Sequence, residues 1–348
     1  MTRSLHDSWT LGGVTIPNRV VLAPLAGIGN WFVRLQAKRH GAGYAISEMV
    51  SSHAIHHGNE RTRTELLRIH PDERASGPTA IQLFGGDPDV MRSAAEHVAQ
   101  VGGVDVIDLN MGCPVPKVCK TGAGAALLDD PDRAVAVARA AREGSGLPVT
   151  VKLRPGLRPG QRTGVELAHR LVEEAGIAGL CMHPRVAKQR HTGRADYDLV
   201  RQLVEELPVP VLISGGLRSA AKVHEVFERT GAEAVLLARG SLGNPWIFEQ
   251  VLGGREDEPT REEILAELDW VLERAVEHLG EQRAARYLRK FYPWYVTRLG
   301  EGKVLQDRLQ RTQSTAEARA ALGIGGVAKP TTWPAEPGPQ GDAVPVAV

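Results

Sequence analysis

The feature that most constrains the fold is a regular alternation of short apolar runs with helix-like segments over residues 20–238. Eight runs are rich in β-branched and other apolar residues: 20–23, 44–47, 79–83, 104–110, 149–153, 179–183, 209–214 and 234–238. Most of the gaps between them hold amphipathic segments, and two of these open with an Asp N-cap followed by proline, at Asp87 and Asp130. Apolar strands that alternate with helices are typical of parallel sheets covered on both faces.

Eight such units predict an α/β protein built on a closed (β/α)₈ TIM barrel. An open doubly wound sheet is the alternative. It calls for a GxGxxG motif after the first strand, and residues 23–27 read APLAG instead.

The rest of the chain predicts a small all-helical domain and a tail. We expect the barrel in residues 1–250, the helical domain in the highly charged residues 258–322, and a disordered tail in the Pro- and Gly-rich residues 327–348. The content of 42% hydrophobic and 24% charged residues is ordinary for a soluble globular protein. The N-terminus has no apolar signal core, and no run of about 18 apolar residues occurs, so we expect a cytoplasmic protein without a membrane partner. The expected state is a monomer.

The three cysteines, Cys113, Cys119 and Cys181, form no CxxC pair, which argues against a disulfide framework and against structural zinc. Cys181 lies within an apolar run and fits a small buried hydrophobe. The segment 51–63 carries three histidines without an acidic or cysteine partner signature, so we interpret them as residues that face the surface or a partner and predict no metal site.

Polar or glycine-rich residues follow nearly every predicted strand, at the barrel end where the chemistry of this fold takes place. In chain order these are Pro24 to Gly27, Glu48, Gln82, Asn110 with Cys113, Lys152, His183 with Arg185, Ser214 to Gly216, and Ala238 to Gly240.

The last two of these loops predict a phosphate site. Their glycines allow a ligand close to the backbone amides, and Arg239 adds a positive charge. The alternative is that the glycines only make tight turns. A phosphate there, with Lys152 across the barrel mouth and amides at Gln82 and Asn110, suggests flavin mononucleotide (FMN).

These residues belong to motifs that resemble the tRNA-dihydrouridine synthases. The motifs are LAPLAGIGN, AIQLFG, DLNMGCPVPKV, VKLR, MHPR, ISGG, ARGSLGNPWIF and RKFYPWY, within residues 10–320. The resemblance implies a flavin-containing TIM barrel, followed by a helical domain that holds tRNA, which reduces the C5–C6 bond of selected uridines with NADPH.

The resemblance also implies individual roles. Cys113 matches the family's proton donor, and Asn110 would hold the target uracil. The FMN-binding residues would be Pro24, Leu25, Ala26, Gln82, Lys152, His183, Ser214, Gly215, Gly216, Ala238, Arg239 and Gly240. This chain departs from the family at Leu25, where methionine is usual, at Pro184 and Val186 after His183, and at Ser214 to Gly216, where Asn-Gly-Asp is common. The last departure removes a carboxylate and leaves the amide cradle.

The proposed mechanism transfers hydride from the reduced flavin to C6 of the uracil, while the Cys113 thiol protonates C5. A cysteine near its ordinary pKa of about 8.5 is mostly protonated at neutral pH, so it can act as an acid.

The charge pattern of the helical region predicts an RNA partner. Residues 256–281 carry ten acidic and two basic side chains, and residues 283–311 carry eight basic and two acidic ones. The basic part interleaves aromatic rings with Arg286, Arg289 and Lys290, which suits RNA, although the aromatic residues equally fit a helix packed on other helices. We also expect Lys117, Lys120 and Arg185 to meet RNA near the site.

Two rival functions remain open at this point. A dihydroorotate dehydrogenase-like flavoenzyme shares the barrel and the Asn…Cys-Pro motif but leaves the basic helical region unexplained. A non-catalytic RNA-binding barrel would not need Gln82, Cys113 and Lys152.

Overall fold

The computed structural model describes residues 3–324, so the expected tail at 327–348 lies outside the described residues. The chain divides into two compact units, the first ending at Glu258 and the second beginning at Pro259. Each unit is described by itself below.

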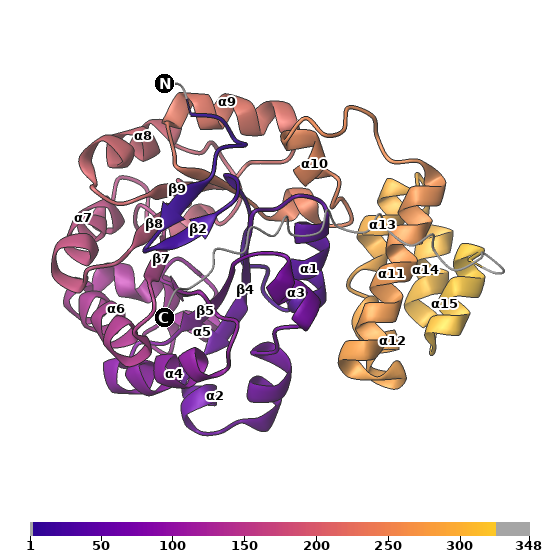
Figure 1. Cartoon of the computed structure of the whole chain (residues 1–348), viewed down its shortest axis with the longest axis horizontal. Helices are drawn as coiled ribbons and strands as arrows, with labels where there is room; N and C mark the ends of the chain where they lie inside the picture. The colour runs from indigo at the N-terminus through magenta and orange to yellow at the C-terminus, as the bar shows by residue number, and fades with distance from the viewer. Residues whose placement is uncertain (1–2, 325–348) are drawn as a thin grey trace, which may run out of the picture. The chain divides into compact units, whose positions relative to one another are not determined.

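The first unit is a closed barrel of eight parallel strands, which confirms the predicted TIM barrel (Figure 1). The strands follow one another around the barrel in chain order, and β10 closes it by pairing with β3. Their bounds are β3 Val20–Leu22, β4 Tyr44–Ser51, β5 Thr79–Phe84, β6 Val106–Asn110, β7 Val149–Leu153, β8 Gly179–Met182, β9 Val211–Ser214 and β10 Ala234–Leu237. Each of the eight predicted runs therefore overlaps one barrel strand, although β4 and β5 extend beyond the predicted ends.

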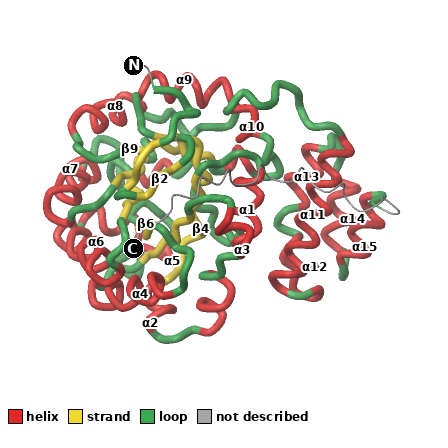
Figure 2. The backbone as a smooth tube through the Cα atoms, viewed as in Figure 1, coloured by secondary structure: helices red, strands yellow, loops and turns green. Residues whose placement is uncertain are grey.

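Helices surround the barrel, and shorter helical turns fill several strand-to-helix connections (Figure 2). The α-helices are α1 Trp31–Arg39, α2 Ser52–His56, α3 Pro71–Ala75, α4 Pro88–Gln100, α5 Pro116–Cys119, α6 Pro131–Ser145, α7 Thr163–Arg170, α8 Tyr197–Glu206, α9 Ala220–Thr230 and α10 Ile247–Val251. The expected N-caps are present, because the Asp87 carboxylate accepts from the amides of Asp89 and Val90, and that of Asp130 accepts from the Arg133 amide.

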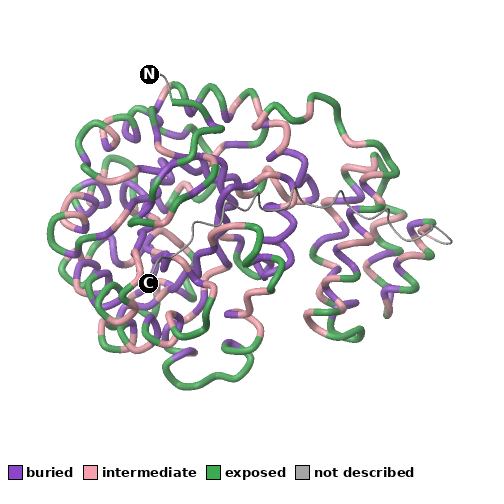
Figure 3. Tube along the Cα trace, viewed as in Figure 1, coloured by how far each residue is buried: buried purple, intermediate pink, exposed green. Residues whose placement is uncertain are grey.

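A hairpin that the sequence reasoning did not predict precedes the barrel. Its strands are β1 Trp9–Leu11 and β2 Val14–Ile16. Trp9, Leu11 and Ile16 join the apolar cluster inside the barrel, and a Cβ added at Gly12 would lie 2.5 Å from Pro148, just before β7. The hairpin therefore closes the amino-terminal end of the barrel and leaves the opposite end for chemistry. Figure 3 shows the barrel interior as buried.

The second unit contains five helices within the part of the chain that the structure describes. They are α11 Arg261–Leu279, α12 Glu281–Leu288, α13 Tyr292–Arg298, α14 Lys303–Arg311 and α15 Thr315–Leu322. A capping box starts α11, since Thr260 and Glu263 each bond to the other's backbone amide. Across residues 3–324, no helix is long and apolar enough to span a membrane.

Candidate active site

The carboxyl ends of β5, β6 and β7 bring three of the predicted residues onto neighbouring strands. In the parallel register, Gln82 pairs with Asp108, Asp108 with Thr150, and Asn110 with Lys152. Because side chains at paired positions share one face, these five lie together on the inside of the barrel.

Hydrogen bonds join this group into one network around a carboxylate. Gln82 and Asp108 are both buried, and the Gln82 Nε2 donates to Asp108 Oδ2 at 2.6 Å. The Thr150 hydroxyl donates to Asp108 Oδ1, also at 2.6 Å. Gln82 Oε1 in turn accepts from Asn110 Nδ2 at 3.0 Å. Burial raises the pKa of Asp108 to about 6, against the opposing effects of its two donors and of Lys152.

Hydrogen bonds and one close contact hold the backbone of the loop that carries Cys113. Asn110 Oδ1 accepts from the amides of Cys113 at 2.9 Å and Gly112 at 3.3 Å. The carbonyl of Gly112 accepts from Arg154 Nε at 2.8 Å. A Cβ at Gly124, whose φ is +61°, would stand 2.8 Å from the Cys113 carbonyl, so this close approach requires glycine. The backbone that carries the thiol is therefore held by the barrel wall.

The three thiols sit in different surroundings. Cys113 is half-buried, and burial raises its pKa, while a backbone hydrogen bond and the nearby Arg154 and Lys152 oppose that rise. Cys181 is buried on β8, and burial raises its pKa to about 11. Cys119 Sγ donates to the Cys113 carbonyl at 3.4 Å. Cys113 is thus partly accessible, and its raised pKa favours the protonated thiol at neutral pH.

His183 and Arg185 follow β8 at the rim of the site. His183 is buried, and its pKa lies far below the usual range because of burial and the surrounding cations, so the imidazole is neutral. Its ring stacks on that of His191, with centroids 5.6 Å apart. Burial and the charges of Arg239, Arg154, Lys152 and Arg185 lower the pKa of His191 to about 4.

The loops after β9 and β10 have the shape expected of an anion cradle. Gly215 and Gly216 have φ values of +102° and +87°. A Cβ at Gly215 would lie 2.5 Å from the His183 ring, and one at Gly240 would lie 2.7 Å from the Leu217 carbonyl. Ser214 is buried, with its hydroxyl beside the Cys181 thiol.

Cations gather beside these loops. The 3₁₀ turn Arg239–Ser241 exposes Arg239, whose pKa is lowered by partial burial and by Arg218 and Arg185. No ion pair with an acidic residue joins these three arginines among residues 3–324. Backbone at positive φ, which glycine adopts without strain, lies next to cations that repel one another and fits a bound phosphate, so the residues present suit FMN.

The loop after β3 carries the other predicted flavin contacts. Leu25 is buried, Pro24 is half-buried and Ala26 is exposed. The amides of Ile28 and Gly29 donate to the Leu25 carbonyl at 3.1 and 2.7 Å, which folds the loop back on itself.

The predicted RNA contacts are not all equally available. Lys117 and Lys120 are exposed in and beside α5, next to the Cys113 loop. In the second unit Arg286 and Lys290 are exposed, and the Lys290 ammonium lies 4.5 Å from the centre of the Tyr287 ring. Arg289 is half-buried and donates to the Thr312 carbonyl at 3.0 Å, so it helps to hold the fold together.

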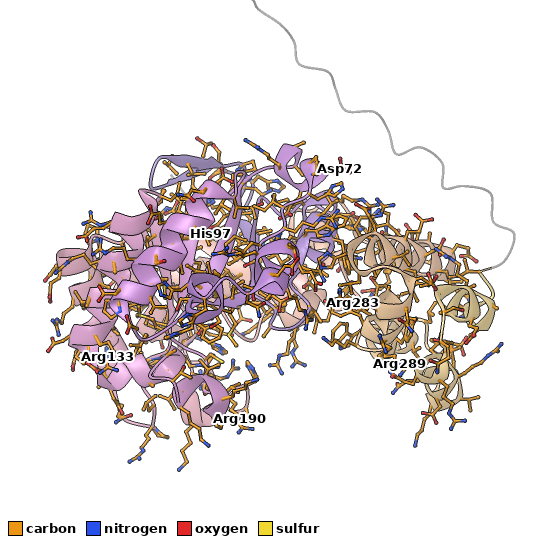
Figure 4. All side chains as sticks on the ribbon, turned by 90° about the horizontal axis from the view of Figure 1, so that it is seen from below. Asp72, His97, Arg133, Arg190, Arg283 and Arg289 are labelled. Atoms are coloured by element: carbon orange, nitrogen blue, oxygen red, sulfur yellow. The ribbon has the colours of Figure 1, made fainter. Side chains whose placement is uncertain are left out.

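Most aromatic residues of the basic stretch in the second unit belong to its hydrophobic core. Phe291, Tyr292 and Tyr295 are buried, whereas Trp294 is half-buried. Figure 4 labels Arg289 on this unit and Arg190 on the loop after β8.

Four residues of the site were missed by the sequence reasoning: Asp108, Thr150, Arg154 and His191. Asp108 could have been found as an acidic residue within an apolar strand, and Arg154 as a cation two positions after Lys152. Arg154 is buried and donates to the carbonyls of Arg185 and Arg190 at 3.0 and 2.9 Å, in addition to Gly112. It therefore ties the loop after β8 to the cysteine loop.

The histidines of segment 51–63 are exposed and lie in and directly after α2. His56 Nδ1 lies 2.9 Å from the Ser93 hydroxyl, and its ring contacts that of His57. Among residues 3–324, no group of three or more His, Cys, Asp or Glu side chains is arranged to hold a metal ion.

Two solved structures have a backbone similar to that of this barrel. Morphinone reductase, solved in complex with tetrahydroNAD, matches with a TM-score of 0.54 at 17% identity and covers 75% of this chain and 94% of its own. A 2-naphthoyl-CoA reductase matches with a TM-score of 0.59 at 12% identity over 73% of this chain and 53% of its own. At these identities the likeness concerns the fold alone.

Sequence relatives are more specific. The model of the dihydrouridine synthase family matches residues 21–325. The tRNA-dihydrouridine synthase B of Pseudomonas aeruginosa is 35% identical over 315 residues, covering 88% of this chain and 92% of the relative. That of Shewanella oneidensis is 33% identical over 295 residues, 82% of this chain and 88% of the relative. The chain belongs to the dihydrouridine synthase family and is an oxidoreductase.

Proposed function

We propose that this protein reduces the C5–C6 double bond of uridines in tRNA to dihydrouridine, in the cytoplasm, with FMN as its cofactor and NADPH as its reductant. The observation that carries the proposal is a partly accessible thiol, Cys113, whose backbone amide is held by Asn110 at the barrel mouth and whose pKa is raised by burial. Family membership supports the reaction, and the names of the relatives support tRNA as substrate.

The loops after β9 and β10 would hold the FMN phosphate through Gly215, Gly216 and Gly240, with Arg239 beside them. Gln82, Lys152 and His183 would contact the flavin ring, as would the backbone of Pro24, Leu25 and Ala26. Bound FMN supplies the hydride, with electrons from NADPH.

Cys113 donates the proton to C5 of the uracil. The thiol is suited to this task because burial keeps its pKa raised, so it carries its proton at neutral pH. Asn110 orients the base through its Nδ2 group, which has one hydrogen on Gln82 and the second near the Met49 sulfur at 3.6 Å. A weak sulfur contact is readily exchanged for a uracil carbonyl.

Lys152 places a positive charge among these groups. Burial lowers its pKa, and Asp108 acts in the opposite direction. In a partly dry site this charge stabilises the negative charge that develops during reduction.

Cations in each of the two units support a polyanionic substrate. Arg185, Lys117 and Lys120 of the first unit, and Arg286 and Lys290 of the second, are proposed to bind RNA phosphates. Arg289 mainly stabilises the fold of the second unit, because its guanidinium donates a hydrogen bond to the Thr312 carbonyl.

The test is nucleoside mass spectrometry of tRNA incubated with the purified protein, FMN and NADPH. Wild-type protein is expected to form dihydrouridine, and Cys113→Ala is expected to lose about two to four orders of magnitude in rate while retaining its flavin. Parallel incubations with orotate distinguish the dihydroorotate dehydrogenase-like alternative. A colourless protein that binds tRNA without reducing it would instead support the non-catalytic alternative. Wild-type turnover by Cys113→Ala would remove the proton-donor role.

A further inference from the structure

Asp108 is a buried carboxylate at the centre of the site to which the reaction assigns no role. It lies 1% exposed on β6, two positions before Asn110, between Gln82 on β5 and Thr150 on β7. Each of its oxygens accepts one hydrogen bond at 2.6 Å, from the Gln82 amide and from the Thr150 hydroxyl.

Hydrogen-bond direction along this network is set from both ends. The amides of Gly112 and Cys113 can only donate, so the Asn110 group facing them must be its oxygen. The Asn110 amine then faces Gln82, which must present its own oxygen there. The Gln82 amine consequently faces Asp108, where an acceptor is needed.

We propose that Asp108 is a positioning residue. As the terminal acceptor of the chain Cys113 N–H → Asn110 → Gln82 → Asp108, it fixes the orientation of both amide side chains and of the cysteine loop. A donor or an apolar group at this position would leave the Gln82 amine unpaired in a buried site, which favours rotation of the amide and breaks the next link.

The role assigned to Asp108 is its acceptor oxygen, and the charge is not needed for it. The groups around it that titrate or carry charge are Lys152 on β7, Cys181 on β8, and Tyr44 on β4. If Asp108 takes up a proton, its carbonyl oxygen still accepts from Gln82 and its hydroxyl can donate to Thr150. Asparagine can do the same, with its oxygen toward Gln82 and its amine toward the Thr150 oxygen.

The experiment compares Asp108→Asn with Asp108→Leu and reads the cysteine loop directly. The readout is the rate at which iodoacetamide alkylates Cys113 in the purified holoprotein at about pH 8, located by peptide mass spectrometry. Asp108→Leu is expected to react about fivefold faster, the factor that corresponds to one ordinary hydrogen bond, because a loosened loop exposes the thiol and lowers its pKa. Asp108→Asn is expected to stay within about twofold of wild type.

Three further measurements separate positioning from general damage. Thr150→Val removes the donor to the other oxygen of Asp108 and is the matched control, expected to leave Cys113 alkylation unchanged. Gln82→Met removes the link between Asn110 and Asp108, so it should accelerate alkylation of Cys113 as Asp108→Leu does. The double variant Gln82→Met with Asp108→Leu should react no faster than either single variant, because both changes break the same chain. Buried Cys181 reports opening of the barrel and should remain unreactive in every variant.

Equal acceleration by Asp108→Asn and Asp108→Leu would assign the effect to the charge and overturn the acceptor role. An unchanged rate in Asp108→Leu would overturn it as well, and so would an additive double variant. The catalytic meaning of the inference rests on the proposed function, and dihydrouridine formation tests that part separately. There, Asp108→Leu should lower kcat more than it raises KM for tRNA. Absence of wild-type turnover would count against the proposed function while the alkylation result still stood.

Discussion

At the scale of single residues, the surroundings of Cys113 favour an acid over a nucleophile. Burial raises the pKa of the thiol, and the nearby cations Arg154 and Lys152 do not fully offset this rise. A reactive nucleophilic cysteine is found in the opposite situation, with a depressed pKa. The same sulfur therefore carries its proton through the neutral range.

This predicts the pH dependence of dihydrouridine formation. A group that must be protonated keeps the rate constant while the pH lies below its pKa and loses activity as the pH rises through it. The initial rate is expected to be flat across neutral pH and to fall once the pH exceeds the ordinary thiol value of about 8.5. Reduction of the bound flavin by NADPH, measured without tRNA, controls for other titrations. A rate that increases as the thiol ionises would indicate a thiolate mechanism.

The raised pKa of Asp108 predicts that the free energy of unfolding depends on pH. Its pKa rises from 3.8 to about 6 on folding, so the folded state binds this proton more tightly than the unfolded state does. That contribution stabilises the protein at low pH and is lost as the pH rises through about 6. Asp108→Asn is therefore expected to increase the free energy of unfolding at pH 7 by as much as about 3 kcal/mol, with the difference shrinking toward pH 4.

Urea unfolding of both proteins at several pH values measures that difference. Thr150→Val serves as the comparison, because it removes a donor to Asp108 without removing the carboxylate. A variant Asp108→Asn that is less stable than wild type at pH 7 would show that the ionised form is needed by the fold.

At the scale of elements, the loop after β9 depends on a glycine whose side-chain space is already filled. Gly215 has a φ of +102°, and an added Cβ would lie 2.5 and 2.6 Å from two atoms of the His183 ring. Gly215→Ala is expected to displace that ring and to abolish FMN binding, seen as loss of the flavin absorbance in the purified protein. Both the strained backbone and the clash contribute.

Gly231→Ala is the matched control. It has a positive φ of +64° at the end of α9, but its nearest neighbour would be 3.8 Å away. It should cost about 1 kcal/mol of stability and keep its flavin. If Gly215→Ala retained full flavin content, the loop after β9 would not be the proposed phosphate cradle.

The elements themselves were largely predictable, and their hydrogen-bonded links were not. Eight strands could be located because strands buried on both faces leave apolar runs, and helices such as α4 and α6 because Asp-Pro marks their first turn. The three-residue strands β1 and β2 leave no such signal. The roles of Asp108 and Arg154 depend on partners as far as 42 residues away, which no local pattern encodes.

At the scale of the whole molecule, the barrel could be predicted from its eight repeated strand–helix units. Which aromatic and basic residues of the helical unit are buried and which are exposed could not be predicted. Phe291, Tyr292 and Tyr295 are core residues, and Arg289 bonds the carbonyl that follows α14. The buried residues of this basic and aromatic stretch thus hold the helices together, and its exposed cations are the ones that we propose to bind RNA.

Because Arg286 and Lys290 are exposed and Arg289 is half-buried, variants at these positions can separate RNA binding from stability. Reversing the exposed charges with Arg286→Glu and Lys290→Glu is expected to weaken tRNA binding and to reduce the slope of log affinity against log salt by about one for each phosphate that is no longer neutralised. Flavin reduction by NADPH should be unchanged, because neither residue belongs to the barrel.

Arg289→Glu should behave differently, lowering the thermal stability of the helical unit because the Thr312 carbonyl loses its donor. A double reversal on the outer helices of the barrel, Arg92→Glu with Arg201→Glu, matches the change in net charge without touching the basic stretch. If that control weakened tRNA binding and lowered the salt slope as much as Arg286→Glu with Lys290→Glu, the effect would follow total charge, and the helical unit would lose its assignment as the RNA-binding part. Affinity measured by filter binding at several salt concentrations decides between the two, because the slope reports the number of phosphates that the protein neutralises.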